Sequence, residues 1–544
     1  MKTIQHPLIK PGTVESRQYQ LAIAMQALEE NTLVVLPTGL GKTVVALLVA
    51  ASRLLNTDGK VLLLAPTKPL VDQHLRFFQN ALALQETEND ACVSFTGDTK
   101  PEKRADIFRR CKICCATPQV IKNDVISGRY SLSDVSLLIV DECHRTTGEY
   151  AYTYLAEEYM QTGRDPLILG MTASPGSDRA RVAEICTHLG ITRVETRDEN
   201  DADVIPYIHE RTVEYIAVPL PEPLRQVVTL IEGMIDTRLG TLTGLNYSLP
   251  RRQNLSMKAL NQLNATIQER IAAGDPTAYQ AASLSAEIMK LRHAVILAES
   301  QGSTALRSYI GKLDSEGRSK KGSRASQRMI QDHRFSEVMR IVSGFTGELH
   351  PKAGITADII HDLLLNESES RAIVFASYRD TVTMLVNYLS DEGITACRFV
   401  GQASRAEEKG LSQKKQIEAI HRFREGEYPV LVATSIGEEG LDIPSTDLVI
   451  FYEAVPSEIR SIQRKGRTGR SSAGRIIVLV TKGTSDEANR WVSNRKEKAM
   501  ASGVKRLRDR TRQESEQTTL FDEKVDPGEG STLPGESEST QPLP

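Results

Sequence analysis

The stretch Pro37-Thr38-Gly39-Leu40-Gly41-Lys42-Thr43 decides the fold of this chain, because of what stands on either side of it. An unbroken apolar run ends at Leu36 and a helix-like segment begins at Val44, which is the strand–loop–helix setting of a phosphate-binding loop. The glycines leave backbone N–H groups free to wrap phosphate oxygens, and the positive end of the following helix favours the same anion. The alternative is a Gly-rich strand–helix turn that binds no nucleotide.

Within this loop the spacing predicts a role for each residue. Thr38, Gly39 and Gly41 are expected to line the phosphates, and Lys42 to contact the β- and γ-phosphates. The hydroxyl of Thr43 is expected to ligate Mg²⁺. Leu36 stands where the general pattern has Gly, and this departure leaves the Gly-Lys-Thr core intact. The sequence therefore predicts an ATP site with Mg²⁺.

Two carboxylates, Asp141 and Glu142, follow the apolar run Leu137–Val140 directly. A carboxylate at the end of a strand beside a phosphate loop can hold the metal, and its neighbour can position and deprotonate the attacking water. We assign Asp141 to Mg²⁺ and Glu142 to the water. His144 is predicted to connect the nucleotide site to a nucleic-acid site.

A basic segment far downstream completes this site. Gln463, Arg464, Arg467 and Arg470 would share one face of a helix, and an all-basic stripe is costly unless an anion lies opposite. Arg467 and Arg470 are therefore predicted as arginine fingers on the γ-phosphate. The alternative is a basic, solvent-facing helix that binds no phosphate.

Short apolar runs alternate with helix-like segments in two parts of the chain, which is typical of parallel sheets covered on both faces. The runs of strand length are Thr32–Leu36, Val61–Ala65, Ile113–Ala116, Leu137–Val140, Leu167–Gly170, Ala372–Phe375, Cys397–Val400, Val430–Ala433, Leu448–Phe451 and Ile476–Val480. Between them lies a segment rich in Leu, Ala, Gln, Lys and Arg that we predict to be helical, with a mobile loop over Ser315–Ser326. The predicted fold is α/β, with two RecA-like parallel-sheet domains in tandem and a helical insertion domain between them. The predicted bounds are 1–210, 211–348 and 349–505, followed by a disordered acidic tail over 506–544.

Composition and charge limit the class of protein. The chain has 544 residues, 25% of them charged and 40% hydrophobic, which is ordinary globular composition. No apolar run reaches the length of a membrane span and the N-terminus lacks the core of a signal peptide, so a cytoplasmic, nucleoid-associated location without membrane partners is expected. Cys111 and Cys114 have ligand-like spacing, but no second pair accompanies them, so we predict no zinc site.

The formal net charge of −3 hides an uneven distribution. The tail from Thr511 to Pro544 carries eight acidic and two basic residues, which leaves +3 for the rest of the chain. Arg251–Gly344 carries fifteen basic and eight acidic residues, including the cluster Arg318, Lys320, Lys321, Arg324 and Arg328. This local excess favours a polyanionic partner, although a solvated helical surface would have the same pattern.

The phosphate loop, the carboxylates and the arginines, taken in this order, resemble those of superfamily 2 helicases, and shorter motifs between them fit the same family. These are Arg17-Gln18-Tyr19-Gln20, Ala65–Leu70, Ala116–Gln119, Thr172-Ala173-Ser174, Ser377-Tyr378-Arg379 and Ala433–Asp442. The resemblance assigns Arg17 and Gln20 to adenine, and it assigns Gly440, Asp442 and Gln463 to the nucleotide. The residues assigned to the nucleic-acid backbone are Thr67, Lys68, Thr117, Pro118, Arg379 and Thr434. The residues assigned to the coupling of ATP hydrolysis to strand movement are His144, Thr172 and Ser174.

A finer resemblance is to the archaeal Hef helicase and its relatives, the Fanconi-anaemia M translocases. It is carried by Gly148–Tyr152, Thr172–Ser177, and the run from Phe399 to Gln413. The resemblance implies an ATP-dependent DNA helicase or translocase acting on forked or branched DNA in replication-fork repair, with the helical insert recognising the fork. The nuclease signature of full-length Hef is not found, so strand cleavage is not expected and a separate nuclease stays an open partner.

The sequence leaves open two alternative functions and one additional partner. The metal motif ends Asp-Glu-Cys-His, a form shared with Dicer- and RIG-I-type helicases, so a duplex-RNA helicase stays open. A scaffold that clamps junctions and hydrolyses ATP poorly is the alternative from another class. In the tail, Gln517–Phe521 weakly resembles a sliding-clamp-binding peptide, and incidental apolar residues in a disordered tail would look the same.

Overall fold

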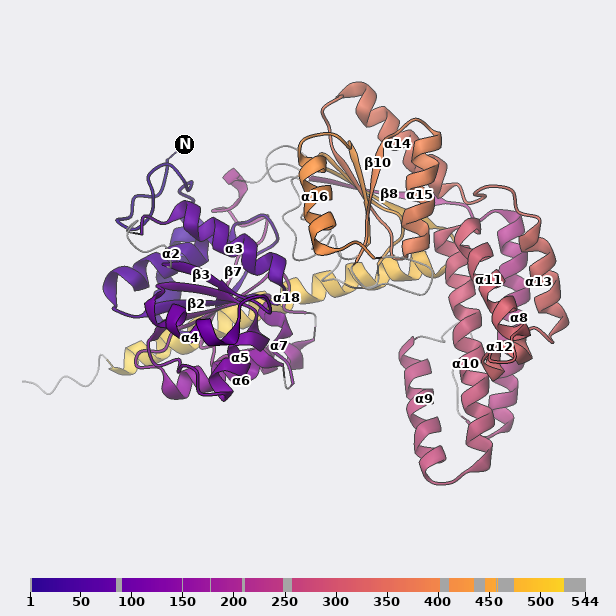
Figure 1. Cartoon of the computed structure of the whole chain (residues 1–544), viewed down its shortest axis with the longest axis horizontal. Helices are drawn as coiled ribbons and strands as arrows, with labels where there is room; N and C mark the ends of the chain where they lie inside the picture. Colours follow the sequence, from indigo (N-terminus) through magenta and orange to yellow (C-terminus); the bar gives the residue numbers. More distant parts are fainter. Residues whose placement is uncertain are drawn as a thin grey trace, which may run out of the picture.

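The computed structural model describes residues 2–84, 91–148, 150–176, 178–207, 211–247, 257–401, 410–434, 446–455, 457 and 474–522. It contains two parallel-sheet domains with a bundle of helices between them in the sequence, which confirms the predicted fold class (Figure 1). No helix within the described residues is both long enough and apolar enough to cross a membrane.

The first sheet domain is built on seven parallel strands in the order β3-β4-β2-β5-β6-β1-β7. In chain order the strands are β1 (Thr32–Val35), β2 (Lys60–Leu64), β3 (Cys92–Phe95), β4 (Ile113–Ala116), β5 (Val135–Asp141), β6 (Ile168–Thr172) and β7 (Arg193–Thr196). Because successive strand residues point to opposite faces, each buried strand supplies two cores. Leu63 and Ile139 face one core, and Leu62 and Leu138 face the other.

Helices cover both faces of this sheet. The first core receives α1 (Gln18–Glu29), α2 (Lys42–Asn56) and α3 (Lys68–Ala81). The second core receives α4 (Pro101–Arg110), α5 (Pro118–Ile126), α6 (Ala151–Thr162) and α7 (Arg179–His188). Since every strand is parallel, all the loops that leave the carboxyl ends of the strands gather at one edge, where the sequence motifs lie.

The second sheet domain has six parallel strands in the order β10-β11-β9-β12-β13-β8. They are β8 (Arg211–Val218), β9 (Ala372–Phe375), β10 (Ala396–Phe399), β11 (Val430–Ala433), β12 (Leu448–Phe451) and β13 (Gly474–Thr481). One face is covered by α14 (Lys352–Asn366) and α15 (Arg379–Asp391), and the other by α16 (Gln413–Arg424).

The helical domain has a single core of its own. It contains α8 (Glu222–Gly244), α9 (Met257–Ala272), α10 (Pro276–Ile296), the π-helical turn η4 (Leu297–Gln301), α11 (Ser303–Arg318), α12 (Arg324–Met329) and α13 (His333–Ser343). Leu-, Ile- and Ala-rich stripes at helical spacing supply this core, as the sequence predicts.

A long last helix, α18 (Ser485–Asp522), starts in the second sheet domain and runs across to the first, as the yellow ribbon of Figure 1 shows. Its residues Met500 and Val504 are buried in the second core of the first sheet domain, and Leu507 packs against that core. The helix therefore ties the two sheet domains together.

The structure differs from the sequence predictions in three places. Residues 211–218 form the edge strand β8 of the second sheet, paired with β13 along its whole length, whereas the prediction places them in the helical domain. Residues 506–522 are helical where disorder is predicted, because α18 gains tertiary contacts through Leu507. The expected loop over Ser315–Ser326 shrinks to a short turn, since α11 and α12 occupy both of its ends.

Candidate nucleotide site and strand-contacting loops

The phosphate loop joins β1 to α2 at the carboxyl edge of the first sheet. Gly39 and Gly41 adopt φ angles of 97° and 76°, the left-handed region that favours glycine. A Cβ at Gly41 would stand 2.3 Å from Nε2 of Gln20, so the loop and α1 have room only for glycine there. The Nζ of Lys42 donates to the carbonyl of Leu36 at 3.0 Å, which places the ammonium across the loop.

Gln20 is fixed beside this loop by α1. Its Nε2 donates to the carbonyl of Leu40 at 3.1 Å, and the hydroxyl of Tyr19 donates to the same oxygen at 2.8 Å. The Oε1 of Gln20 is buried and has no hydrogen-bond partner among the residues that the structure describes. A buried acceptor of this kind fits the exocyclic amine of adenine. Arg17 stands at the start of the same helix, paired with Glu15 at 2.9 Å.

Asp141 ends β5 and faces His74 of α3. The Oδ2 of Asp141 lies 2.8 Å from Nε2 of His74, and both side chains are buried. Burial alone would raise the pKa of Asp141, but His74 and the ammonium of Lys42 outweigh it and lower the pKa, so the carboxylate stays charged. Sequence reasoning missed His74, although a histidine at helical spacing between the buried Val71 and Phe78 was an available signal.

Glu142 has an unusual backbone. Its φ is 49°, in the left-handed region that a residue with a Cβ enters only at a cost of about 1–3 kcal/mol. This turn puts Oε2 of Glu142 at 3.2 Å from Nδ1 of His144, without hydrogen-bond geometry, so the buried oxygen keeps its accepting capacity. A buried carboxylate with spare lone pairs can orient a water and accept its proton.

The predicted coupling residues form one chain of contacts. Nδ1 of His144 lies 3.0 Å from Oγ1 of Thr172, which accepts from the N–H of Ser174 at 3.1 Å. The hydroxyl of Ser174 in turn donates to Sδ of Met500 at 2.7 Å. The structure thus brings His144, Thr172 and Ser174 together and extends the chain to α18, a link that sequence spacing could not reveal.

The residues assigned to the nucleic-acid backbone lie at helix starts in the first sheet domain. Thr67 is the N-cap of α3, and Lys68 follows it and pairs with Asp98. Thr117 is the N-cap of α5, and Pro118 is its first residue. The two helices leave β2 and β4, which are neighbours in the sheet, so their N–H-rich ends form one anion-attracting edge.

The second sheet domain contributes Arg379 and Thr434. Arg379 opens α15 and donates from its guanidinium to the carbonyl of Gly401 at 3.2 Å. Thr434 follows β11, the neighbour of β9 in the sheet, and its N–H donates to Phe399 at 3.0 Å. The predicted nucleotide contacts Gly440, Asp442, Gln463, Arg467 and Arg470 lie outside the described residues.

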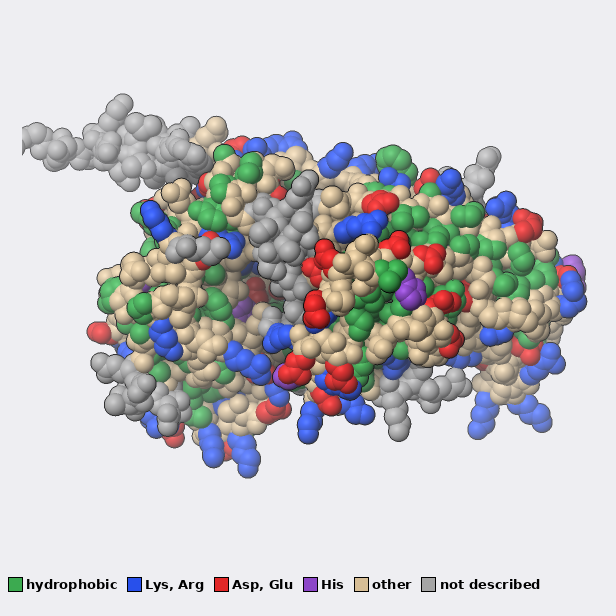
Figure 2. Space-filling model, turned by 90° about the horizontal axis from the view of Figure 1, so that it is seen from above, with side chains coloured by type: hydrophobic (Ala, Val, Ile, Leu, Met, Phe, Trp, Pro, Cys, Tyr) green, Lys and Arg blue, Asp and Glu red, His purple; other side chains and the backbone are tan. Residues whose placement is uncertain are grey.

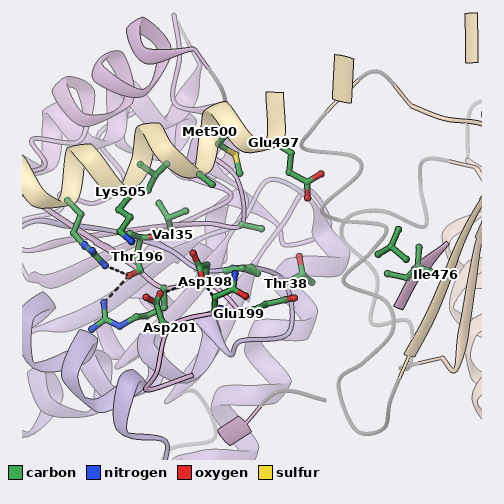
Figure 3. A pocket seen from close by; sticks show the side chains of 18 residues that line it. Val35, Thr38, Thr196, Asp198, Glu199, Asp201, Ile476, Glu497, Met500 and Lys505 are labelled. Carbon is green, nitrogen blue, oxygen red and sulfur yellow. Dashed lines mark hydrogen bonds between the residues drawn. The ribbon is translucent and has the colours of Figure 1, made fainter. Parts of the chain in front are cut away.

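A cavity of about 360 Å³ opens beside the phosphate loop. Figure 3 shows Val35 and Thr38 on one side of it, α18 with Met500 and Lys505 above, and Ile476 of the second sheet across the gap. The acidic loop with Asp198, Glu199 and Asp201 forms part of its lining. The space around the loop is therefore bounded by both sheet domains and by α18.

The residues present fit ATP with Mg²⁺. The left-handed glycines cradle phosphates, the orphaned oxygen of Gln20 suits adenine, and Asp141 and Thr43 offer the hard oxygen ligands that Mg²⁺ prefers. Two parallel-sheet domains with such a site at the carboxyl edge of the first sheet are typical of the superfamily 2 helicases.

Three family models match parts of the chain. "DEAD/DEAH box helicase" matches residues 17–182, and "Helicase conserved C-terminal domain" matches residues 356–472. "Putative ATP-dependent RNA helicase, helical bundle" matches residues 223–344. The domains are thus of helicase type, with ATP binding implied.

Among similar proteins, a "Putative ATP-dependent RNA helicase" of Methanocaldococcus jannaschii is 43% identical over 93% of this chain and 62% of its own length. The ATP-dependent DNA helicase mph1 of Neurospora crassa is 34% identical over 90% of this chain and 42% of its own length. The Fanconi anemia group M protein homolog of Mus musculus is 33% identical over 90% of this chain and 26% of its own length. The chain therefore spans only part of the length of these relatives.

The crystal structure of the Pyrococcus furiosus Hef helicase domain matches with a TM-score of 0.69 and 42% identity, over 89% of this chain and all of that one. The chain belongs to the superfamily 2 helicases of the Hef, Mph1 and Fanconi-anaemia M group.

Proposed function

We propose that this chain is an ATP-dependent DNA helicase or translocase that unwinds or remodels forked or branched DNA in replication-fork repair. The observation that carries the proposal is the continuous contact chain from Glu142 through His144 and Thr172 to Ser174. It joins the group assigned to hydrolysis to the edge of the sheet where the strand-contacting loops lie. A change at the nucleotide can therefore be transmitted to the nucleic acid through rigid groups.

Each residue has a defined task in this mechanism. Lys42 and the start of α2 hold the phosphates, and Glu142 orients the attacking water and accepts its proton. Thr43 and Asp141 would hold Mg²⁺, which would supply positive charge beside the phosphates. Arg467 and Arg470 of the second sheet domain stabilise the transferring phosphoryl group as the domains close.

Five fungal relatives that are 30–34% identical to this chain are named ATP-dependent DNA helicases, which favours DNA. The Methanocaldococcus protein, which is 43% identical, and the helical-bundle family carry RNA in their names instead. Duplex RNA is therefore the second candidate substrate, in line with the Dicer- and RIG-I-type form of the metal motif.

A polyanion is also supported by the helical domain. Its basic residues around the turn between α11 and α12 are exposed: Arg318, Lys320, Lys321, Arg324 and Arg328. Figure 2 shows one face of the whole molecule, on which charges of both signs are mixed. Acidic side chains gather near its middle, and many Lys and Arg side chains stand along its lower edge and at its ends. Local basic sites of this kind contact the phosphate backbone, and binding should weaken with salt.

The test is a steady-state ATPase assay of wild type, Lys42→Ala and Lys103→Ala, an exposed lysine of α4 that serves as the matched control. Each protein is measured without polymer and with forked DNA, single-stranded DNA or duplex RNA. We expect stimulation by forked DNA in wild type and in Lys103→Ala, and a loss of about a hundredfold or more in Lys42→Ala. Stimulation by duplex RNA alone would move the function to the RNA alternative.

The same assay separates the motor from a junction-binding scaffold. Glu142→Gln should keep DNA binding and lose hydrolysis and unwinding, because the amide cannot accept the proton of water. A Glu142→Gln protein that still remodels forks would support the scaffold. Three further proposals accompany the DNA-helicase function. They are a sliding clamp bound through Gln517–Phe521, a separate nuclease as partner, and a location at the nucleoid.

A further inference from the structure

The loop that carries Arg379 is held in place from outside its own domain. The hydroxyl of Ser377 donates to Oε1 of Glu453 at 2.6 Å, and Gln301 of the helical domain donates from Nε2 to Oε2 of the same carboxylate at 3.2 Å. The hydroxyl of Thr381 donates to Oε1 of Gln301 at 2.9 Å. Gln301 thus bridges both ends of the segment in which Arg379 lies.

Two other residues of this segment also contact the helical domain. The ring of Tyr378 lies 5.3 Å from that of His293 and packs against the core of the helical domain. His293 in turn meets Tyr309 edge to face at 4.6 Å. Asp380 lies 3.9 Å from Nζ of Lys312 on α11. The helical domain therefore touches the residues on both sides of Arg379.

The bridging glutamine comes from an unusual piece of backbone. The π-helical turn Leu297–Gln301 is buried throughout and separates α10 from α11, and such turns occur mostly at functional sites. Its other polar residues bind the start of α18, where Ser485 donates to Glu299 at 2.6 Å and Ser300 donates to Asp486 at 2.7 Å. Gln301 is consequently fixed with little freedom to adjust.

Burial makes these contacts stiff. Gln301, Thr381 and Glu453 are exposed by only 1%, 0% and 5%. Polar groups removed from water have to keep their partners, because a buried donor or acceptor left unpaired is costly. A shift of the turn relative to the second sheet therefore has to move the loop with it or break buried hydrogen bonds.

We propose that Gln301 is a positioning residue for nucleic-acid binding, through which the helical domain sets the place of the Arg379 loop in the second sheet domain. This rests on the proposed function, since Arg379 is assigned to the nucleic-acid backbone. Nucleic acid that binds the helical domain then affects how the second sheet domain contacts the nucleic-acid backbone. The shape of the substrate is thereby coupled to the contact that Arg379 makes with the strand.

The test compares Gln301→Ala with Ser285→Ala, which removes a part-buried hydrogen bond from the buried Ser285 to Asn264 inside the helical domain alone. ATPase is titrated with single-stranded and forked DNA. For Gln301→Ala we expect the DNA concentration at half-maximal ATPase to rise about tenfold, as for a lost buried hydrogen-bond pair. The rate at saturating DNA should fall by no more than about twofold, because the nucleotide site is untouched.

Thr381→Val keeps the shape of the side chain and removes the donor to Gln301, so it should shift the same titration even if Gln301→Ala folds poorly. The exchanged pair, Gln301→Glu with Glu453→Gln, can form the three hydrogen bonds that join Ser377, Glu453, Gln301 and Thr381, and should restore most of the wild-type value. Melting temperatures exclude a folding defect.

The outcomes separate two failures. A titration of Gln301→Ala and Thr381→Val that matches Ser285→Ala would overturn the positioning role while leaving the helicase function standing. If DNA stimulates no form of the protein, including wild type, the proposed function falls and the inference falls with it.

Discussion

Replacing Asp486 by asparagine should destabilise the second sheet domain strongly, because it leaves a buried ammonium without its counter-charge. Nζ of Lys352 lies 2.5 Å from Oδ2 of Asp486, and the two side chains are 0% and 1% exposed. Asp486 lies in the first turn of α18 and Lys352 starts α14, so the pair joins two helices at the end of β13. Asparagine keeps the shape and an acceptor for the hydroxyl of Ser300, but its NH2 group replaces the Oδ2 that accepts from Lys352 and Thr481, so the charge and these hydrogen bonds are lost together.

The cost of leaving one charge of a buried pair without its partner sets the size of the effect. Breaking a buried ion pair in this way costs about 3–5 kcal/mol. For a domain of this size, each kcal/mol lowers the melting temperature by about 2–4 °C, so a fall of about 10 °C is expected.

Scanning calorimetry measures this effect. Adding Lys352→Met removes the second charge and should recover most of the stability. The reasoning is refuted if the double variant is as unstable as Asp486→Asn.

Two further predictions concern histidines. His74→Ala should weaken Mg²⁺-dependent binding of a fluorescent nucleotide about tenfold, because Asp141 loses the group that orients it. Binding measured in EDTA, without the metal ion, should change little. His74→Gln keeps a hydrogen-bond donor and should therefore bind the nucleotide more tightly than His74→Ala. Burial lowers the pKa of His350 to about 4, so the unfolded chain takes up a proton near pH 6.5 that the folded chain refuses. The free energy of unfolding should therefore fall by about 3 kcal/mol as the pH drops from 6.5 to 4. Urea titrations over this pH range should show that wild type loses this stability and His350→Gln does not. An equal pH dependence of the unfolding free energy in both proteins would contradict this assignment.

Most strands were predictable from sequence, and the edge strands β3, β7 and β8 were not. Continuous apolar runs such as Ile113–Ala116 and Val430–Ala433 coincide with β4 and β11. The edge strands β3, β7 and β8 include polar residues such as Ser, Arg, Glu and Thr, so hydrophobicity gives only a weak signal for them. They are defined by pairing with a neighbouring strand, which is a tertiary property.

Some features of the candidate site could also be predicted from the sequence, and others could not. Positions that follow from chain-local chemistry could be predicted: the glycines of the phosphate loop are left-handed, and Asp141 ends β5. The roles assigned to these residues stay predictions. Contacts between distant segments could not, because Met500 reaches Ser174 and Gln301 reaches Glu453 across domains. Nothing in the local pattern of either segment indicates its partner. The roles of Arg467 and Arg470 stay predictions, since both residues lie outside the described part of the chain.

Both long-range contacts are connected to α18, because Met500 belongs to this helix and the turn that carries Gln301 contacts its start through Asp486. α18 is held at its start by the buried Asp486 and, farther along, by Met500 and Val504 in the core of the first sheet domain. At 1.5 Å per residue, Asp486 and Met500 stand about 21 Å apart along the helix. Between them the guanidinium of Arg490 stacks on the ring of Tyr215 in β8, so this part of the helix also packs on the second sheet domain. Closure of the two domains on a nucleotide must therefore pivot or bend this helix or release one anchor. Because one anchor touches Ser174 and the other touches the turn that holds the Arg379 loop, any such movement acts on the nucleotide side and on the strand-contacting side together.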